Sequence, residues 1–504
     1  MIALLQTAAL PSLKQPTIVA VALVYFAIVA AIGVWATRRT RTAGDFFVAG
    51  RKIGVLPLAL AAMAATVSGF VFIGGPGFVY GAGVGALYLV LSASITTSMG
   101  AWVLAKRLRL LGEVRALMTI PDAIGARYRS PSAQGLAGAA IIIAVVGYMA
   151  TNILALGLVI DAVFDVGLTA GIWLGMTITL AYSVAGGILA GVYTDVFQGT
   201  LMAVASLLVF LFALQAGGGG EGLAGISRTI SAADPEFFGP WGKLTPIAAL
   251  SLFFVFGLGS LAQPHVVHKF YMLRDARQLK WYPALMSVAL IMTLLLYFAV
   301  GVATKSLVVQ GQLPPLTRPD DATPLFLLNA TPVLLAALVF SGVAAAIMST
   351  VNSFMSIGAA AVTHDMPKAL GRRVSNELLW GRVSTVVISV LAALLAQLSG
   401  TLVAFLGIFG WGLFASTLVP SLAVGLNWPG ATREGAVASI STGLIITLVF
   451  ETLAYFKAYT FPAGVSASGL ALVLSLLVFF GVSWLTRRGP GAEIDPDVRM
   501  VMDL

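Results

Sequence analysis

Cysteine is absent from this chain of 504 residues, and charged residues are scarce. The absence of thiols excludes disulfides and cysteine chemistry, although it leaves the cellular compartment undecided. Charged side chains make up 10% of the sequence, whereas soluble proteins carry about 25%. Hydrophobic residues make up 59%. This composition excludes an ordinary soluble domain and predicts a protein that crosses a membrane many times.

Apolar runs long enough to cross a bilayer recur along the whole chain, and no soluble domain separates them. We expect an all-α polytopic membrane protein with about thirteen spans, in a single transmembrane domain over residues 1–504. The N-terminus lacks a basic segment of the kind that opens a cleaved signal peptide, so none is expected. The expected spans are 17–37, 53–80, 84–105, 134–164, 167–190, 193–216, 245–268, 281–304, 331–363, 382–398, 401–426, 434–454 and 464–485.

The formal net charge of +9 comes mainly from short segments that follow odd-numbered spans. Basic residues follow spans 1, 3, 7, 9, 11 and 13, and Lys269 belongs to the group after span 7. With thirteen spans, all these segments lie on one side of the membrane, and the positive-inside rule makes that side cytoplasmic. We therefore expect a cell-membrane protein with an outside N-terminus, a cytoplasmic C-terminus and no nucleic-acid partner.

Asp195 stands inside the sixth apolar run, with no basic residue near it in the sequence. An unpaired carboxylate is costly in hydrocarbon, so such a group usually faces the protein interior and marks a path for ions or protons. The sequence therefore predicts that a cation is handled within the membrane. A structural hydrogen bond near the cytoplasmic end of this span is the alternative.

Two expected spans contain residues that interrupt helices. The second includes the stretch 68–77, with four glycines and Pro76, and the seventh includes Gly257, Gly259 and Pro264. Proline removes a backbone donor and glycine weakens a helix, so each span is predicted to break near mid-membrane. Because the two spans are five apart, the matched interruptions indicate the binding site of an inverted-repeat transporter.

The ninth span places several small polar groups close together. Ala346, Ser349 and Thr350 share one helix face, and Asn352 and Ser353 extend the polarity to a neighbouring patch. Hydroxyl and free carbonyl oxygens are the ligands that a hard cation prefers. Close helix packing is the alternative explanation for the serine and threonine residues.

Five short motifs, in matching order along nearly the whole chain, resemble the sodium:solute symporter family. They are residues 46–51 before span 2, Thr-Ile-Pro-Asp at 119–122, Tyr-Thr-Asp at 193–195, Gln-Pro-His at 263–265, and Ala346-x-x-Ser349-Thr350. The resemblance implies a LeuT-type core of five plus five helices, with inverted repeats at about 53–216 and 245–426. It implies a transporter and not an enzyme.

By the same resemblance, sodium binds between the second and ninth spans. The residues implied for this site are Ala64, Val67, Ala346, Ser349 and Thr350. Some members of the family carry a second sodium site, with a carboxylate on span 6 and hydroxyls on span 9. Its counterparts here are Asp195, Ser349, Asn352 and Ser353. Because Asn352 stands where a hydroxyl is usual, the second sodium stays open.

The resemblance places the solute between the two interrupted spans, beside spans 4 and 11. The expected wall residues are Phe70, Gly74, Tyr148, Phe256, Ser260 and Gln263. Thr66, Phe70 and Phe256 depart from the residues typical of proline-transporting members, and such apolar walls argue against a sugar. A small monocarboxylate or compact amino acid fits best, with its carboxylate at the helix N-terminus after the first break.

We therefore expect a sodium-driven symporter that imports a small organic solute across the lipid bilayer by alternating access. The oligomeric state stays open. A proton-coupled carrier with Asp195 as the protonated group is the nearest alternative. A transporter-like sensor would need an output domain, and none follows residue 485. A membrane enzyme would need clustered catalytic residues, but the chain has three histidines and no HExxH motif.

Overall fold

A computed structural model describes residues 16–38, 49–400, 403–459, 461 and 465–503, with only the backbone at 37, 50, 182, 184–190 and 405. Apart from one β-bridge between Ile53 and Leu273, the regular elements of this part of the chain are helices, as expected. The motif at 46–51 lies mostly outside the described residues, which resume at Ala49.

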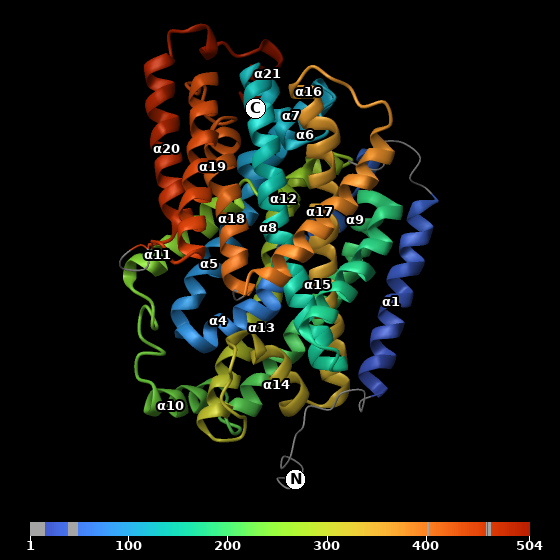
Figure 1. Cartoon of the computed structure of the whole chain (residues 1–504), viewed down its shortest axis with the longest axis vertical. Coiled ribbons are helices and arrows are strands. Elements are labelled where there is room, and N and C mark those ends of the chain that lie inside the picture. Colours follow the sequence, from blue (N-terminus) through green and yellow to red (C-terminus); the bar gives the residue numbers. More distant parts are fainter. Residues whose placement is uncertain (1–15, 39–48, 401–402, 460, 462–464, 504) are drawn as a thin grey trace.

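The helices form one elongated bundle in which α8 and α15 lie near the centre and α1 and α20 lie at the edges (Figure 1). The long helices are α1 (Pro16–Thr37), α5 (Leu87–Gly100), α8 (Pro131–Phe164), α9 (Leu168–Gly217), α11 (Pro246–Ser260), α13 (Tyr282–Val309), α15 (Val333–Ala360), α17 (Glu377–Leu398), α18 (Val403–Leu418), α19 (Arg433–Tyr455) and α20 (Ala467–Thr486). Shorter helices are α3 (Val55–Thr66), α4 (Gly75–Ala82), α6 (Lys106–Val114), α7 (Ile120–Tyr128), α10 (Leu223–Ala233), α12 (Pro264–Val267), α14 (Ala322–Ala330), α16 (Met366–Ala369) and α21 (Pro496–Met502).

Eleven helical segments in the described part of the chain are long and apolar enough to cross a membrane. Two shorter apolar helices, Val55–Thr66 and Leu168–Ala181, fall within the expected spans 2 and 5. The exact number of thirteen spans stays a prediction. Spans 5 and 6 share the single helix α9, which contains no proline to end helical hydrogen bonding between them.

The backbone leaves helical geometry at the edge of the first stretch where the sequence predicts a break and within the second. Helix α3 ends at Thr66, Val67 is extended (φ −85°, ψ 103°), and a π-helical turn resumes at Phe70. Helix α11 ends at Ser260, and α12 begins at Pro264 after an extended Gln263. The residue before a proline is sterically disfavoured from the helical region, which accounts for Gln263. The division into two inverted repeats at 53–216 and 245–426 stays a prediction.

Small residues bring the first interruption against the two central helices. Every residue of the chain from 339 to 361 is buried, and α15 carries small residues at Gly342 and at 344–346, which are all alanine. A side chain at Gly69 would come within 2.7 Å of Ala155 on α8 and 2.9 Å of Ile347 on α15. Small side chains allow such close approach between membrane helices. The interrupted span therefore lies wedged between α8 and α15.

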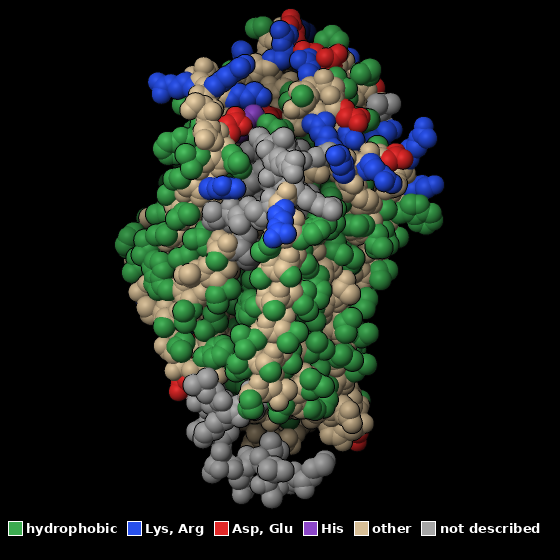
Figure 2. All heavy atoms as spheres, turned by 90° about the vertical axis from the view of Figure 1, so that its right-hand side faces the viewer, with side chains coloured by type: hydrophobic (Ala, Val, Ile, Leu, Met, Phe, Trp, Pro, Cys, Tyr) green, Lys and Arg blue, Asp and Glu red, His purple; other side chains and the backbone are tan. Residues whose placement is uncertain are grey.

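Charge is distributed unevenly along the long axis of the molecule. On the face shown in Figure 2, lysine and arginine side chains gather at one end, and a broad hydrophobic band covers the middle. The C-terminal helix α21 lies at the basic end (Figure 1). This pattern is typical of a membrane protein whose middle faces lipid.

Candidate functional site

Ser349 and Thr350 on α15 face the end of α3 at the first interruption. Ser349 Oγ lies 2.6 Å from the carbonyl oxygen of Ala64 and 3.1 Å from that of Ala346. Thr350 Oγ1 lies 3.1 Å from the carbonyl oxygen of Ala65 and 2.9 Å from that of Ala346. All five residues are buried without measurable exposure.

The chemistry of these oxygens follows from where α3 stops. The last carbonyl groups of a helix lack intrahelical partners and carry partial negative charge. The hydroxyls of Ser349 and Thr350 donate to these carbonyls, and each could instead turn a lone pair toward a cation. All the oxygens in this arrangement are uncharged hydroxyl or carbonyl groups. Such oxygens are suitable ligands for a hard cation that has lost its water shell.

Four of the five residues implied for the first sodium site therefore lie together, namely Ala64, Ala346, Ser349 and Thr350. Ala65, which the resemblance did not give, joins them through its carbonyl. Val67 lies beyond the end of α3, where its amide donates to Met63 and its side chain lines a cavity. A role for the Val67 carbonyl stays a prediction.

Asp195 on α9 has a partner, so the expectation of an unpaired carboxylate is wrong. Lys269 Nζ lies 3.0 Å from Asp195 Oδ2 and 3.3 Å from Ser353 Oγ on α15. The two charged side chains are 1% and 0% exposed. Lys269 was expected in a basic segment outside the membrane, but the 3-10 helix His268–Met272 after α12 turns it into the protein.

Ser349 and Asn352 are the other two residues implied for the second sodium site. Among the described contacts, neither bonds to Asp195 or Lys269. Ser349 contacts the end of α3 instead. Asn352 is buried against α9, where a side chain at Gly191 would come within 2.1 Å of its amide nitrogen. The structure therefore joins Asp195 and Ser353 through Lys269.

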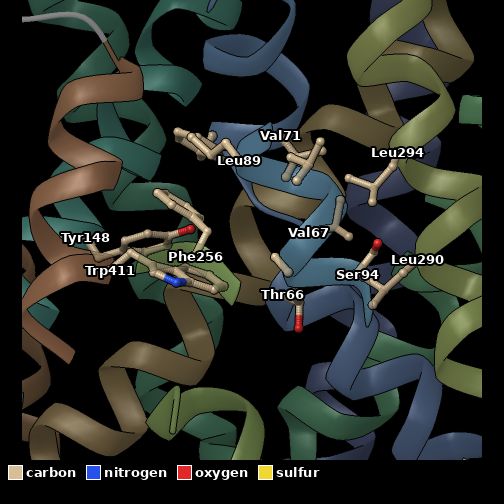
Figure 3. A pocket seen from close by; sticks show the side chains of 13 residues that line it. Thr66, Val67, Val71, Leu89, Ser94, Tyr148, Phe256, Leu290, Leu294 and Trp411 are labelled. Atoms are coloured by element: carbon tan, nitrogen blue, oxygen red, sulfur yellow. The ribbon is translucent and has the colours of Figure 1, made fainter. Parts of the chain in front are cut away.

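A narrow cavity lies beside the first interruption, with about 30 Å³ of free space (Figure 3). This is room for one or two water molecules and too little for an amino acid. No charged residue lines it. Its lining residues are Thr66, Val67, Phe70, Val71, Leu89, Val90, Ala93, Ser94, Tyr148, Phe256, Leu290, Leu294 and Trp411.

Three of the six expected wall residues line this cavity, namely Phe70, Tyr148 and Phe256. The other three lie elsewhere. A side chain at Gly74 would come within 3.0 Å of the Ala404 backbone nitrogen at the start of α18. Ser260 Oγ donates to the Phe256 carbonyl at 2.7 Å, and Gln263 Nε2 lies 3.4 Å from the Trp411 carbonyl.

Trp411 on α18 is the wall residue that sequence reasoning missed. Its ring stacks on Phe256 at 5.1 Å and 14°, and Phe256 stacks on Phe70 at 5.6 Å and 21°. Figure 3 shows Trp411, Phe256 and Tyr148 together on one side of the cavity, across from Thr66 and Ser94. The Trp411 Nε1–H group is buried without a hydrogen-bond partner in the described structure. The sequence feature that could have identified Trp411 is its position between Gly410 and Gly412 on span 11.

The amides that follow the first interruption already have acceptors. Gly69 N donates to Asn152 Oδ1 at 2.9 Å, and Phe70 N donates to Ser68 Oγ at 3.2 Å. The next two amides donate to the Ser68 carbonyl. A solute carboxylate could bind this helix N-terminus only by displacing these partners.

The Thr-Ile-Pro-Asp motif forms a polar cluster at the basic end of the bundle. Asp122 on α7 lies 2.7 Å from Lys368 Nζ and 3.0 Å from His364 Nε2, so it ties α7 to the end of the α15 span. Burial alone would raise the pKa of Asp122, but the hydrogen bonds and charges of His364 and Lys368 outweigh it and hold that pKa below its usual range. Asp365 accepts from Thr119 Oγ1 in the same cluster.

Comparison with known proteins identifies the family of this chain. A model of the sodium:solute symporter family matches residues 46–443. The osmoregulated proline transporter OpuE of Bacillus subtilis is 27% identical over 471 residues, which are 92% of this chain and 94% of that protein. A sodium/proline symporter of Staphylococcus aureus is 26% identical over 502 residues and 95% of each chain.

Solved structures share the fold. A Na+-coupled sialic acid symporter, solved in a substrate-bound outward-open state, superposes with a TM-score of 0.73 at 18% identity, over 94% of this chain and 97% of that one. MhsT in complex with L-phenylalanine gives a TM-score of 0.50 at 15% identity, over 86% and 98%. These likenesses agree with the expected LeuT-type fold. The family and the named relatives are transporters rather than enzymes. The chain belongs to the sodium:solute symporter family.

Proposed function

We propose that this protein couples sodium entry to the uptake of a small organic solute by alternating access. The observation that carries the proposal is the set of buried oxygens from Ser349, Thr350, Ala64 and Ala65, where the open end of α3 meets α15. A sodium ion bound there would replace the hydroxyl-to-carbonyl hydrogen bonds and hold the two helices together.

Sodium and solute would share one structural element. The carbonyls of Ala64 and Ala65 end α3, and the next residues, Thr66 and Val67, line the aromatic cavity. An ion that orders the end of α3 therefore also orders one wall of the solute site. The effect must be reciprocal, so bound solute would raise the affinity for sodium by the same factor.

One sodium ion per cycle supplies enough free energy for a concentrating importer. A charge that crosses 100 mV contributes about 2.3 kcal/mol. A tenfold sodium gradient adds about 1.4 kcal/mol. For a zwitterionic amino acid, whose cycle moves one net charge, the two contributions together support accumulation of several hundredfold. For a monocarboxylate anion the cycle moves no net charge, so the sodium gradient alone supports about tenfold accumulation.

We propose a small monocarboxylate or compact amino acid as the solute. The cavity walls are apolar and aromatic, which suits a compact apolar body, and the unpartnered Trp411 Nε1–H is a donor for a carboxylate. Proline is the first amino acid to test, because two relatives are named for it. Other solutes should be tested alongside proline, because three positions differ from the residues typical of proline carriers. These positions are Thr66, Phe70 and Phe256.

We propose the cell membrane as the location, with the basic end of the bundle in the cytoplasm. The gathering of lysine and arginine (Figure 2) at the end that holds α21 (Figure 1) supports this orientation. The C-terminus would then be cytoplasmic and the N-terminus outside.

Uptake into proteoliposomes tests the proposal. Labelled proline, other amino acids and short monocarboxylates would be offered with and without an inward sodium gradient. Sodium-dependent accumulation of one compound supports symport and names the solute. Accumulation of that compound at equal rates with and without sodium would contradict it.

A further inference from the structure

A lysine side chain lies where the family resemblance placed a second sodium ion. Lys269 Nζ is 3.0 Å from the carboxylate of Asp195 and 3.3 Å from the hydroxyl of Ser353. These are a carboxylate on the sixth span and a hydroxyl on the ninth, the two kinds of ligand that such a site needs. An ammonium group therefore contacts the ligands that would otherwise hold a cation.

The site is closed to solvent. Asp195, Lys269 and Ser353 are each 1% exposed or less. An isolated charge at such a position is strongly unfavourable, and an opposite charge in direct contact offsets the loss of hydration. With Lys269 in place the carboxylate is compensated, and a sodium ion bound to Asp195 would lie against the ammonium.

The seventh span delivers the lysine. After the interruption at 261–263, α12 and the 3-10 helix His268–Met272 bring Lys269 to α9 and α15. The amine is covalently part of the protein, so it neither dissociates nor crosses the membrane with the solute.

We propose that the ε-ammonium of Lys269 is a built-in cation that fills the second cation site, so that each cycle carries one sodium ion. This inference rests on the proposed function, because it takes sodium as the coupling ion. Asp195 and Ser353 then hold the lysine, and the oxygens of Ser349 and Thr350 remain for the transported ion.

The test counts sodium ions on the purified full-length protein with ²²Na+ as the probe. The wild-type chain is expected to bind one ion. Lys269→Met keeps the length of the side chain and removes its charge, so it is expected to bind one ion more. Lys269→Arg and the double variant Asp195→Asn/Lys269→Met, in which no carboxylate is left uncompensated, are expected to match the wild type.

Two ions bound to the wild-type chain would overturn the role of Lys269, as would a folded Lys269→Met protein that binds no more sodium than the wild type. If Lys269→Met does not fold, the Hill coefficient of sodium-dependent wild-type uptake decides, with one supporting the proposal and two overturning it. The first sodium site is tested separately with Ser349→Ala/Thr350→Ala. Unchanged sodium binding in that variant would contradict the assignment of the first site, but the comparison of Lys269→Met with the wild type would still hold.

Discussion

A hydroxyl group can donate a hydrogen bond or serve as a cation ligand, and Ser349 and Thr350 are placed to do both. Each lies within hydrogen-bond distance of a carbonyl at the end of α3 and of the Ala346 carbonyl on its own helix. If sodium binds there as proposed, each hydroxyl hydrogen has to turn away from its carbonyl so that the oxygen can face the ion.

Ser349→Ala/Thr350→Ala is expected to raise the sodium concentration for half-maximal uptake. A contact between a polar group and a charge is worth about 1.5–3 kcal/mol, so each lost hydroxyl should cost about tenfold or more in sodium affinity. The sodium dependence of uptake measures this. Ser341→Ala is the matched control, because Ser341 on the same helix bonds to the carbonyl of Ala337 in its own turn. An unchanged sodium dependence in the double variant would contradict the site.

Trp411→Phe is expected to weaken solute binding while sodium binding stays the same. Phenylalanine keeps a ring to stack on Phe256 but removes the buried Nε1–H donor. A lost bond to a charged group corresponds to about tenfold or more in the concentration for half-maximal uptake. Trp380→Phe on the exposed face of α17 is the control. Equal solute affinities in the two variants would exclude a bond from Trp411 to the solute.

Single residues show what could and could not be predicted from the sequence. Ser349 and Thr350 stood out because two hydroxyls share one face of an apolar helix. Lys269 was misplaced because sequence position does not show whether a charged residue at the end of a span points outward or folds back. Trp411 was missed because an aromatic residue on a membrane helix looks the same whether it faces lipid or a cavity.

At the scale of elements, the stretches with glycine and proline predicted an interruption after α3 and another after α11, and the second ends at Pro264. Pro76 instead lies within α4, and Gly257 and Gly259 lie within α11. The continuous helix across 168–217 was not predicted. Neither was the cluster that joins α7 to the end of the α15 span through Asp122 and Lys368. That cluster depends on which segments meet in space, and the spacing of residues does not encode it.

Gly69→Ala is expected to destabilise the protein and abolish uptake. The added methyl group would lie 2.7 Å from Ala155 and 2.9 Å from Ile347, so α8 or α15 would have to move. Overpacking of this kind costs roughly 1–3 kcal/mol. Thermal unfolding of the purified protein measures it. The control is Gly81→Ala, where a side chain meets no atom within 4 Å, and equal unfolding temperatures for the two variants would contradict the close packing.

Asp320, in the 3-10 turn Pro319–Asp321 before α14, makes one contact between elements sensitive to pH. Its Oδ2 accepts the amide of Val403 at the start of α18 at 2.8 Å. Burial, aided by the nearby charge of Asp321, raises the pKa of Asp320 to about 6 against the opposing effects of Val403 and Arg318. Because this pKa is higher in the folded protein, the folded state binds the proton more tightly. Stability should therefore rise as pH falls through about 6.

Thermal unfolding at pH 7.5 and pH 5.5, compared between the wild type and Asp320→Asn, measures this effect. Asparagine keeps an acceptor oxygen and does not titrate. The wild type is expected to gain more stability on acidification than the variant. The same pH dependence in both proteins would show that Asp320 does not titrate in this range.

For the whole molecule, the family and the fold were predicted mainly from the order of the five motifs along the chain. The family model covers residues 46–443, and the bundle superposes on a sodium-coupled symporter over 94% of this chain. The solute could not be predicted in the same way, because it depends on a few wall residues whose positions only the folded structure gives. The orientation in the membrane stays a proposal that rests on the charge asymmetry of Figure 2.

The most direct test of sodium coupling is to exchange the driving ion in proteoliposomes that contain the purified protein. Uptake of the solute identified from the panel would be compared under an inward sodium gradient at equal pH and under an inward proton gradient without sodium. The account predicts accumulation with the sodium gradient, its loss when the gradient is collapsed, and none with protons alone. Accumulation that follows the proton gradient and is indifferent to sodium would contradict it.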